Sequence, residues 1–177
     1  SALLGYANIM NLKDARRYPV VSLAAEYLAM GYLLRRNILA YKAPPNNEGY
    51  DLICIHPDPK KSGEQVRVQV KSRYQTDCDR AFPVKAKSFE AFDYLIIVFL
   101  NNGYYYRKRP IRDGLVEPEL FTLPAEFIRE HHVTMESGWE KVLTKGQNME
   151  RYRNENGFEL IASDLQIPYP GETAAGG

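Results

Sequence analysis

The sequence has few cysteines, no long apolar run and almost no net charge. Its two cysteines, Cys54 and Cys78, are too few for a disulfide framework or a zinc cluster. The longest run of strongly apolar residues, 94–100, is far shorter than the roughly 20 residues that a membrane-spanning helix needs. No basic-then-apolar leader opens the chain. We therefore expect a cytoplasmic protein without a membrane span.

Two common catalytic motifs are also absent. The chain has neither a Gly-rich phosphate-binding loop nor a Gly-x-Ser-x-Gly elbow. These absences argue against a P-loop nucleotide hydrolase and against a serine hydrolase of the α/β type.

Composition and length favour one folded domain spanning residues 1–177. Apolar residues make up 45% of the chain and charged residues 25%, which excludes disorder as the main state. The net charge of +1 hides an asymmetry. Residues 1–90 hold 14 basic and 9 acidic residues, a balance of +5, and residues 91–177 hold 9 and 13, a balance of −4. The basic half is a weak indication of an anionic ligand, and an ordinary solvated surface explains it equally well.

Residue patterning predicts an α/β fold in which helices flank a central mixed sheet. An apolar helix from Ser22 to Asn37, with Ser22 as N-cap, should be largely buried. The strand at 94–100 is apolar throughout and should be central, covered on both faces. Other expected strands lie at 38–42, 50–55, 65–73 and 104–107, with helices at 88–92, 123–129 and 158–165. The strands at 50–55 and 65–73 should pair as a hairpin.

The strand at 65–73 has the most informative pattern. Three valines alternate with polar residues, so Gln69 and Lys71 lie side by side on the face opposite the valines. Strands that merely face solvent show the same alternation. This pattern therefore indicates a site only if other residues join it.

Asp51 is the first residue that joins it. Hairpin pairing would bring its carboxylate close to Gln69 and Lys71. A carboxylate, an amide oxygen and a backbone carbonyl are hard oxygen ligands that Mg²⁺ accepts, and a nearby lysine can orient or deprotonate an attacking water. We expect the Asp51 carboxylate within about 6 Å of the Lys71 amine, which leaves room for a metal and one water. Asp51 is alternatively a turn-capping residue.

Glu26 is the only charged residue between Val20 and Leu34. A buried carboxylate without a partner costs several kcal/mol, so a buried Glu26 would need a proton or a cation, which a metal site would supply. We then expect Glu26 to face the same cleft as Asp51. Alternatively, Glu26 lies on a narrow exposed stripe of the helix.

Together these residues resemble the PD-(D/E)XK nuclease superfamily. The resemblance rests on Glu26, on Gly49-Tyr50-Asp51-Leu52 and on Val68-Gln69-Val70-Lys71-Ser72, and it covers about residues 20–107. It implies a restriction-endonuclease-like core of the order αβββαβ, with residues from about 110 to 170 as an extension. In that family the helix glutamate helps to bind metal, the strand aspartate is the principal ligand, and the lysine serves the attacking water. The resemblance thus assigns the metal (Mg²⁺ or Mn²⁺) to Asp51, Gln69, the Val70 carbonyl and Glu26, and the water to Lys71.

Two departures from the superfamily pattern qualify the resemblance. Tyr50 stands where proline is common, and Gln69 stands where an acidic residue is commoner. A neutral Gln69 removes one negative charge, so metal binding should depend more on Asp51 and Glu26.

Phosphate contacts are expected from residues that follow the lysine or lead into the next helix, namely Ser72, Arg73, Gln75, Lys85 and Lys87, although each would also suit an ordinary surface. The aromatic and basic segment 104–109 would serve as a stacking platform or as strand packing.

The sequence therefore predicts a metal-dependent endonuclease that hydrolyses nucleic acid, with DNA as the expected substrate. Cutting both strands would favour a homodimer with two-fold symmetry. Two rivals stay open. One is a nuclease-fold module that binds nucleic acid without cutting it, and the other is a small α/β scaffold that contacts protein partners through its acidic half.

Overall fold

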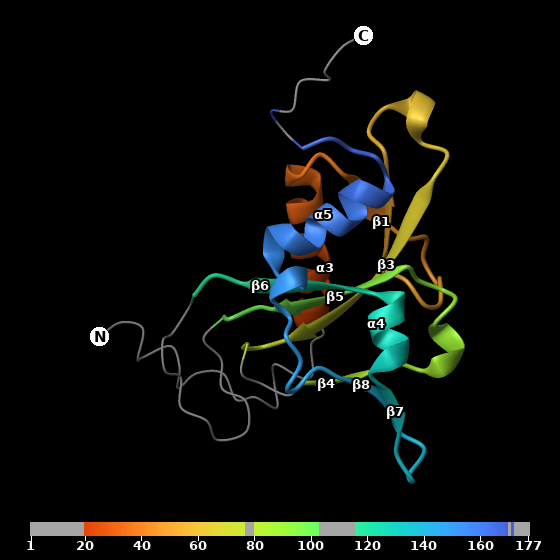
Figure 1. Ribbon diagram of the computed structural model, residues 1–177, viewed down its shortest axis with the longest axis vertical. Coiled ribbons are helices and arrows are strands. Elements are labelled where there is room, and N and C mark those ends of the chain that lie inside the picture. Colours follow the sequence, from red (N-terminus) through yellow and green to blue (C-terminus); the bar gives the residue numbers. More distant parts are fainter. Residues whose placement is uncertain (1–19, 77–79, 103–115, 170, 172–177) are drawn as a thin grey trace.

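The computed structural model describes residues 20–76, 80–102, 116–169 and 171. Its elements are α3 (Val20–Arg35), β1 (Leu39–Lys42), β2 (Leu52–Ile55), η1 (Pro59–Lys61), β3 (Gln65–Arg73), β4 (Ala81–Pro83), η2 (Ala86–Ser88), β5 (Tyr94–Phe99), β6 (Glu119–Pro124), α4 (Ala125–Glu130), β7 (His132–Thr134), β8 (Glu140–Leu143), η3 (Glu150–Tyr152) and α5 (Asn154–Asp164). A five-stranded sheet has the order β1-β2-β3-β5-β6, and a small sheet, β4-β8-β7, lies below it in Figure 1.

The large sheet is mixed. Its first three strands form an antiparallel meander, β3 and β5 pair in parallel, and β5 and β6 pair antiparallel. The predicted hairpin is confirmed, because β2 and β3 pair directly and the η1 turn lies between them. Helices α3 and α5 pack on one face of the sheet and α4 on the other. The predicted fold class, a central mixed sheet flanked by helices, is therefore confirmed.

Strand β5 is an interior strand of the large sheet, between β3 and β6. All six of its residues are buried, as its unbroken apolar sequence predicted. Because successive side chains of a strand point to opposite faces, β5 contributes to two separate cores. The core that contains α3 and α5 receives Tyr94, Ile96 and Val98, and the core that contains β4, β8 and α4 receives Leu95, Ile97 and Phe99.

Helix α3 is less buried than its composition predicted. Its fully buried residues, Ala25, Ala29 and Leu33, recur every four positions and form one stripe against the sheet. On other sides of the helix, Leu23 is 46% and Tyr27 is 54% exposed. The prediction of a largely buried helix is wrong, because α3 packs against only one layer and no described element covers its outer side.

Two predicted helices need correction. The expected helix at 88–92 is a single turn, η2, that ends at Ser88. The expected helix at 123–129 is divided, because residues through Pro124 extend the sheet as β6 and α4 begins only at Ala125. Proline lacks an N–H group and so suits the junction of a strand and a helix.

The three strands of the small sheet were not predicted from the sequence, and neither was β6 of the large sheet. β4 and β7 have three residues each and β8 has four, too few to show a clear period. The predicted closing helix is confirmed as α5, which starts four residues earlier than expected, at Asn154. The expected strand at 104–107 and the segment 104–109 lie outside the described residues. Among the described helices, none combines the length and apolar character needed to cross a bilayer.

Candidate active site

The candidate site lies where β2 and β3 separate. The ladder between them begins at the pair Leu52 and Val68, so β3 continues past Val68 without a β2 partner. Asp51 occupies this fork. Its backbone N–H donates to the Val68 carbonyl at 2.8 Å, and its Oδ2 accepts a hydrogen bond from the Val70 N–H at 2.7 Å. The carboxylate thus replaces the missing ladder bond, which is the capping role that the sequence left open for Asp51.

The surroundings of Asp51 go beyond a simple cap. Burial raises the pKa of the Asp51 carboxyl, and the negative charge of Glu26 raises it further. The Val70 N–H and the charges of Lys71 and Lys42 oppose this increase in the pKa. Three of the predicted site residues, Glu26, Asp51 and Lys71, therefore share one neighbourhood. A carboxyl with a raised pKa binds a proton more tightly than an ordinary carboxyl, and another cation can take the place of that proton.

Glu26 already has a cation, and it is a lysine. The Lys42 ammonium at the end of β1 donates a hydrogen bond to the Glu26 carboxylate, whose side chain is only 19% exposed. This hydrogen bond is the main reason why the pKa of Lys42 is raised. The sequence indicates that a buried Glu26 needs a cation, but it does not identify Lys42, because β1 lies beside α3 only in the folded chain.

Gln69 and Lys71 point to the face of β3 opposite the valines, as the alternation predicted. The Gln69 Oε1 is buried and has no hydrogen-bond partner among the described residues. Such an atom costs about 1–3 kcal/mol when it stays unpaired. Burial also lowers the pKa of Lys71, and the charge of Arg73 lowers it further, against the attraction of Asp51. No described residue forms an ion pair or hydrogen bond with the Lys71 ammonium.

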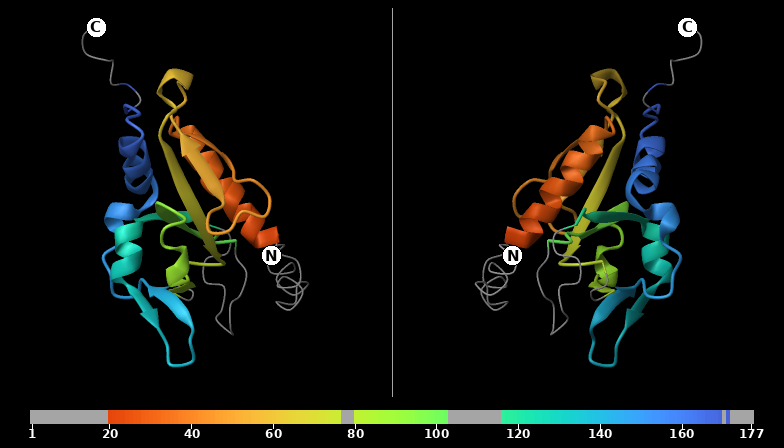
Figure 2. Two further views of the ribbon diagram at one scale, coloured as in Figure 1. Left: turned by 90° about the vertical axis from the view of Figure 1, so that its right-hand side faces the viewer. Right: turned by 90° about the vertical axis from the view of Figure 1, so that its left-hand side faces the viewer.

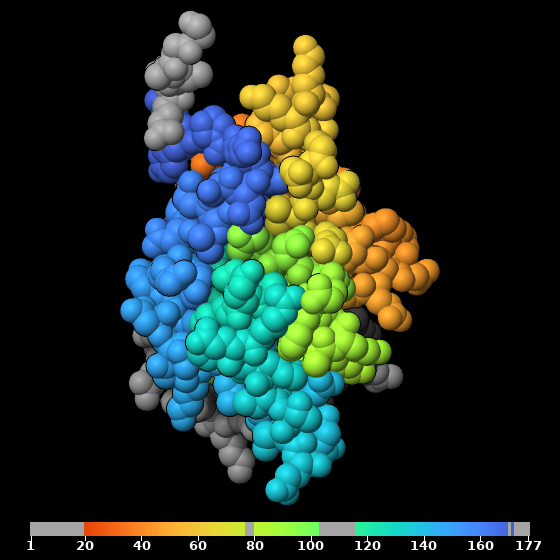
Figure 3. Space-filling view, turned by 45° about the vertical axis from the view of Figure 1, so that its right-hand side comes forward, coloured from red at the N-terminus to blue at the C-terminus, as the bar shows by residue number. Residues whose placement is uncertain are grey.

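Both side chains line an open pocket of about 340 Å³. The segment around η2 and the β7–β8 hairpin form its other walls, and Figure 3 shows these two segments side by side. The lining residues are Gln69, Lys71, Pro83, Val84, Lys85, Ser88, Gly138, Trp139 and Glu140. Lys85 was a predicted phosphate contact, whereas Trp139 and Glu140 were not expected at the site. Asp51 and Glu26 do not line this pocket.

The other predicted phosphate contacts lie in different surroundings. The Arg73 guanidinium stacks 4.5 Å from the Phe82 ring and donates to carbonyl oxygens of Ser72 and Ala81, so packing occupies it. By strand alternation, Ser72 lies on the same face of β3 as the valines, opposite Gln69 and Lys71. Gln75 lies in the bend after β3, and Lys87 is exposed in η2. Of the five residues, only Lys85 lines the pocket.

The oxygen donors at this fork are of the chemical kind that a divalent cation accepts. No group of three or more His, Cys, Asp or Glu side chains in the described part of the chain could hold a metal. Mg²⁺ needs fewer, since one or two carboxylates suffice when waters and substrate phosphates complete its shell. Asp51 supplies a carboxylate, and Gln69 supplies an oxygen to which no described residue donates. The Val70 carbonyl points to the same edge of β3 as its N–H.

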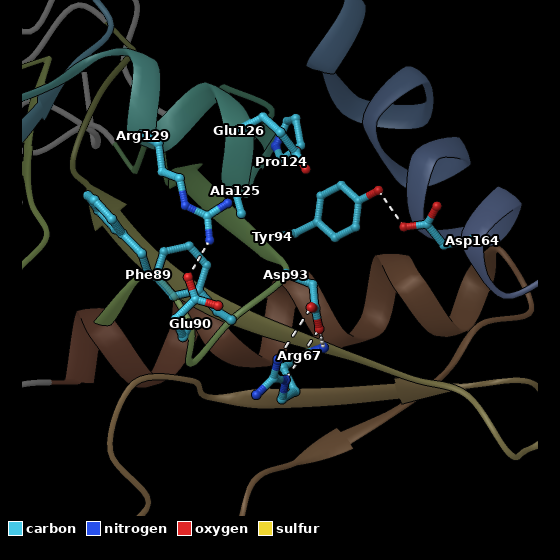
Figure 4. Close-up of a pocket in the computed structure, with 11 residues that line it drawn as sticks. Arg67, Phe89, Glu90, Asp93, Tyr94, Pro124, Ala125, Glu126, Arg129 and Asp164 are labelled. Carbon is cyan, nitrogen blue, oxygen red and sulfur yellow. Dashed lines mark hydrogen bonds and ion pairs between the residues drawn. The ribbon is translucent and has the colours of Figure 1, made fainter. Parts of the chain in front are cut away.

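A second pocket, of about 250 Å³, lies at the beginning of β5 (Figure 4). Six of its polar side chains form three pairs. The Asp93 Oδ2 accepts a hydrogen bond from the Arg67 backbone N–H at 2.7 Å, and the Arg67 guanidinium also donates to this carboxylate. Arg129 donates to Glu90 at 2.9 Å, and the Tyr94 hydroxyl donates to Asp164 at 2.6 Å. These groups satisfy one another, so this pocket is the weaker candidate for chemistry.

No family model matches the sequence, and no curated protein matches it. Solved structures of similar shape include a bacterial homing endonuclease, which is 16% identical, with 82% of this chain and 91% of that chain covered and a TM-score of 0.48. They also include Hjc, a Holliday junction resolvase from the archaeal hyperthermophile Archaeoglobus fulgidus, which is 10% identical, with 84% and 98% covered and a TM-score of 0.42. At such values the likeness concerns overall shape alone.

Proposed function

We propose that the protein is a metal-dependent endonuclease that hydrolyses phosphodiester bonds of DNA. The observation that carries the proposal is the juxtaposition at the β2–β3 fork. Half-buried Asp51 stands directly before β2, and Gln69 and Lys71 lie on the neighbouring β3. Within the described residues, the Gln69 Oε1 has no hydrogen-bond partner and the Lys71 ammonium forms no ion pair. A fold stabilised only by packing would gain from pairing these groups, so their availability favours a ligand.

Each residue has a distinct role in this proposal. Asp51 and Gln69 would hold Mg²⁺ or Mn²⁺, with the Val70 carbonyl beside them. The ion would supply Lewis-acid stabilisation of the charge that develops on the scissile phosphate. Lys71 orients the attacking water, and its lowered pKa makes the neutral amine more accessible as a base for the water's proton. Glu26 acts on Asp51 through its charge while paired with Lys42.

The test compares cutting of plasmid, single-stranded DNA and RNA by the full chain with Mg²⁺, with Mn²⁺ and with EDTA. We expect cutting that EDTA abolishes and that Lys71→Ala reduces by at least about 100-fold, as is typical for loss of general acid–base catalysis. Lys61→Ala is the control, because Lys61 is an exposed lysine of η1 that does not line the pocket. Equal cutting by wild type and Lys71→Ala would refute the proposal.

A second candidate function is binding of nucleic acid without cleavage. It is favoured by the neutral Gln69 and by the engagement of Glu26 with Lys42, which together leave Asp51 as the carboxylate available to a metal. This alternative predicts retained DNA binding with no metal-dependent cutting in any of the assays above. Calorimetric titration with Mn²⁺ separates it from the first candidate, because a module that binds nucleic acid without a metal should show no heat of Mn²⁺ binding.

A further inference from the structure

Trp139 is a large aromatic side chain held in an exposed position at the pocket. It is 46% exposed and lines the same pocket as Gln69 and Lys71. Its backbone is fixed by the hairpin turn, since the Met135 N–H donates to the Trp139 carbonyl at 2.8 Å and Gly138 adopts φ 81°. Figure 2 shows this hairpin, β7–β8, extending from the body of the molecule. A half-exposed tryptophan held at a fixed place offers aromatic surface to a ligand.

One cation lies against this aromatic ring, and two more line the same pocket. The Lys141 ammonium lies 4.3 Å from the Trp139 ring centroid, over one of its faces. Lys71 and Lys85 line the same pocket. The one carboxylate of the pocket, Glu140, is engaged locally, because it accepts the Ala86 N–H at 2.8 Å and lies 3.7 Å from the His132 ring. The pocket therefore combines an aromatic face with an excess of cations.

We propose that Trp139 stacks on an unpaired base of the nucleic acid, while Lys85 and Lys141 contact the flanking phosphates. Aromatic faces with nearby cations are the usual means of holding single strands, because every base has a π-face and every linkage has a charge. In a regular duplex both faces of a base are already stacked, so the ring would engage single-stranded or splayed nucleotides. This inference rests on the proposed function and names its substrate class.

The chain itself provides the probe, because Trp139 is its only tryptophan. The full chain is titrated in EDTA with an oligothymidine and with a DNA duplex of equal length, and the intrinsic fluorescence is recorded. Stacking of a base on the indole is expected to quench the fluorescence with the single strand. We expect the single strand to bind at least about 10-fold more tightly than the duplex, since stacking is available only to unpaired bases.

Substitutions test the ring directly, with binding measured by anisotropy of a labelled oligonucleotide. Trp139→Ala should weaken single-strand binding on the order of 5- to 150-fold, and Trp139→Phe should retain most of the binding. Tyr169→Ala is the matched control, because the Tyr169 ring is 58% exposed and has the Arg36 guanidinium 5.3 Å from its centroid, yet it does not line the pocket.

The outcomes separate this inference from the proposed function. Quenching together with a loss of affinity in Trp139→Ala supports a stacking role even if no variant cuts DNA, in which case only the catalytic proposal fails. Metal-dependent cutting that needs Lys71, combined with wild-type affinity in Trp139→Ala or absent quenching, overturns the stacking role alone. Thermal unfolding of each variant shows whether the fold is intact, and Trp139→Phe covers the case in which the alanine variant does not fold.

Discussion

Two carboxylates, Asp51 and Asp93, bind the backbone of the same strand from opposite edges. Asp51 accepts the Val70 N–H on the β2 side of β3, and Asp93 accepts the Arg67 N–H on the β5 side, both at 2.7 Å. Each replaces a ladder bond that the sheet lacks at that point. Backbone capping is therefore common to both positions, and it does not indicate a catalytic role.

The neighbours of the two carboxylates differ. The Arg67 guanidinium pairs with Asp93, and nearby Tyr94 pairs with Asp164 and Arg129 with Glu90 (Figure 4). Asp51 has another carboxylate, Glu26, as its neighbour and burial that raises its pKa, while Gln69 and Lys71 on the adjoining strand have no partner in the described part of the chain. Polar and charged groups that lack a partner among the described residues, rather than acidic residues as such, therefore distinguish the candidate site.

The largest difference is expected in catalysis. Asp51→Asn should reduce metal-dependent cutting by more than about 100-fold, because the metal's stabilisation of the transition state is worth several kcal/mol. Asp93→Asn should cut like the wild type. In both variants the asparagine side chain can still accept the backbone N–H. Initial rates on plasmid measure the effect, and calorimetry should show heat of Mn²⁺ binding for Asp93→Asn only. Equal rates for the two variants would remove the distinction between the two edges of β3.

A smaller difference is expected in stability. Gln69→Leu should increase the free energy of unfolding by about 1 kcal/mol, because it removes a buried oxygen that has no partner in the part of the chain that the structure describes. Tyr94→Phe should decrease it by about 1 kcal/mol, because the Tyr94 hydroxyl donates to Asp164 at 2.6 Å. Urea unfolding measures both variants. A destabilised Gln69→Leu would mean that the amide already has a structural partner.

The smallest effect is expected in the pH dependence of stability, measured in EDTA. The folded-state pKa of Asp51 is raised above its ordinary value of 3.8, chiefly by burial, so the folded protein holds this proton more tightly than the unfolded chain. That contribution to stability is present below pH 3.8 and is lost as the pH rises through the higher folded-state pKa. Asp51→Asn should therefore gain stability relative to wild type as the pH rises above 3.8. A constant difference between the two proteins across this range would contradict the raised pKa.

Much of the fold could be predicted from local patterns. The alternation in β3, the apolar run of β5 and the pairing of β2 with β3 each depend on residues that are close in sequence. Helix α3 was located correctly, but its burial was overestimated, since composition does not tell how many layers cover a helix. The β7–β8 hairpin was missed because its strands have only three and four residues.

The candidate site could be predicted only in part. Asp51, Gln69 and Lys71 come from adjacent strands of one hairpin, so the register that brings them together is readable from the chain. Lys42 and Trp139 could not be assigned in this way. Each reaches the site from a segment whose position depends on long-range packing.

The sequence alone implied an acidic residue, an amide and a lysine on neighbouring strands, because strand periodicity and hairpin pairing are local properties. Folding in three dimensions decided which of these groups are paired and which are left available. It joined Glu26 to Lys42, packed Arg73 against Phe82, and brought Trp139 to the pocket that Lys71 lines. The physical reason is that pairing and burial depend on contacts between distant segments, and no local period carries that information.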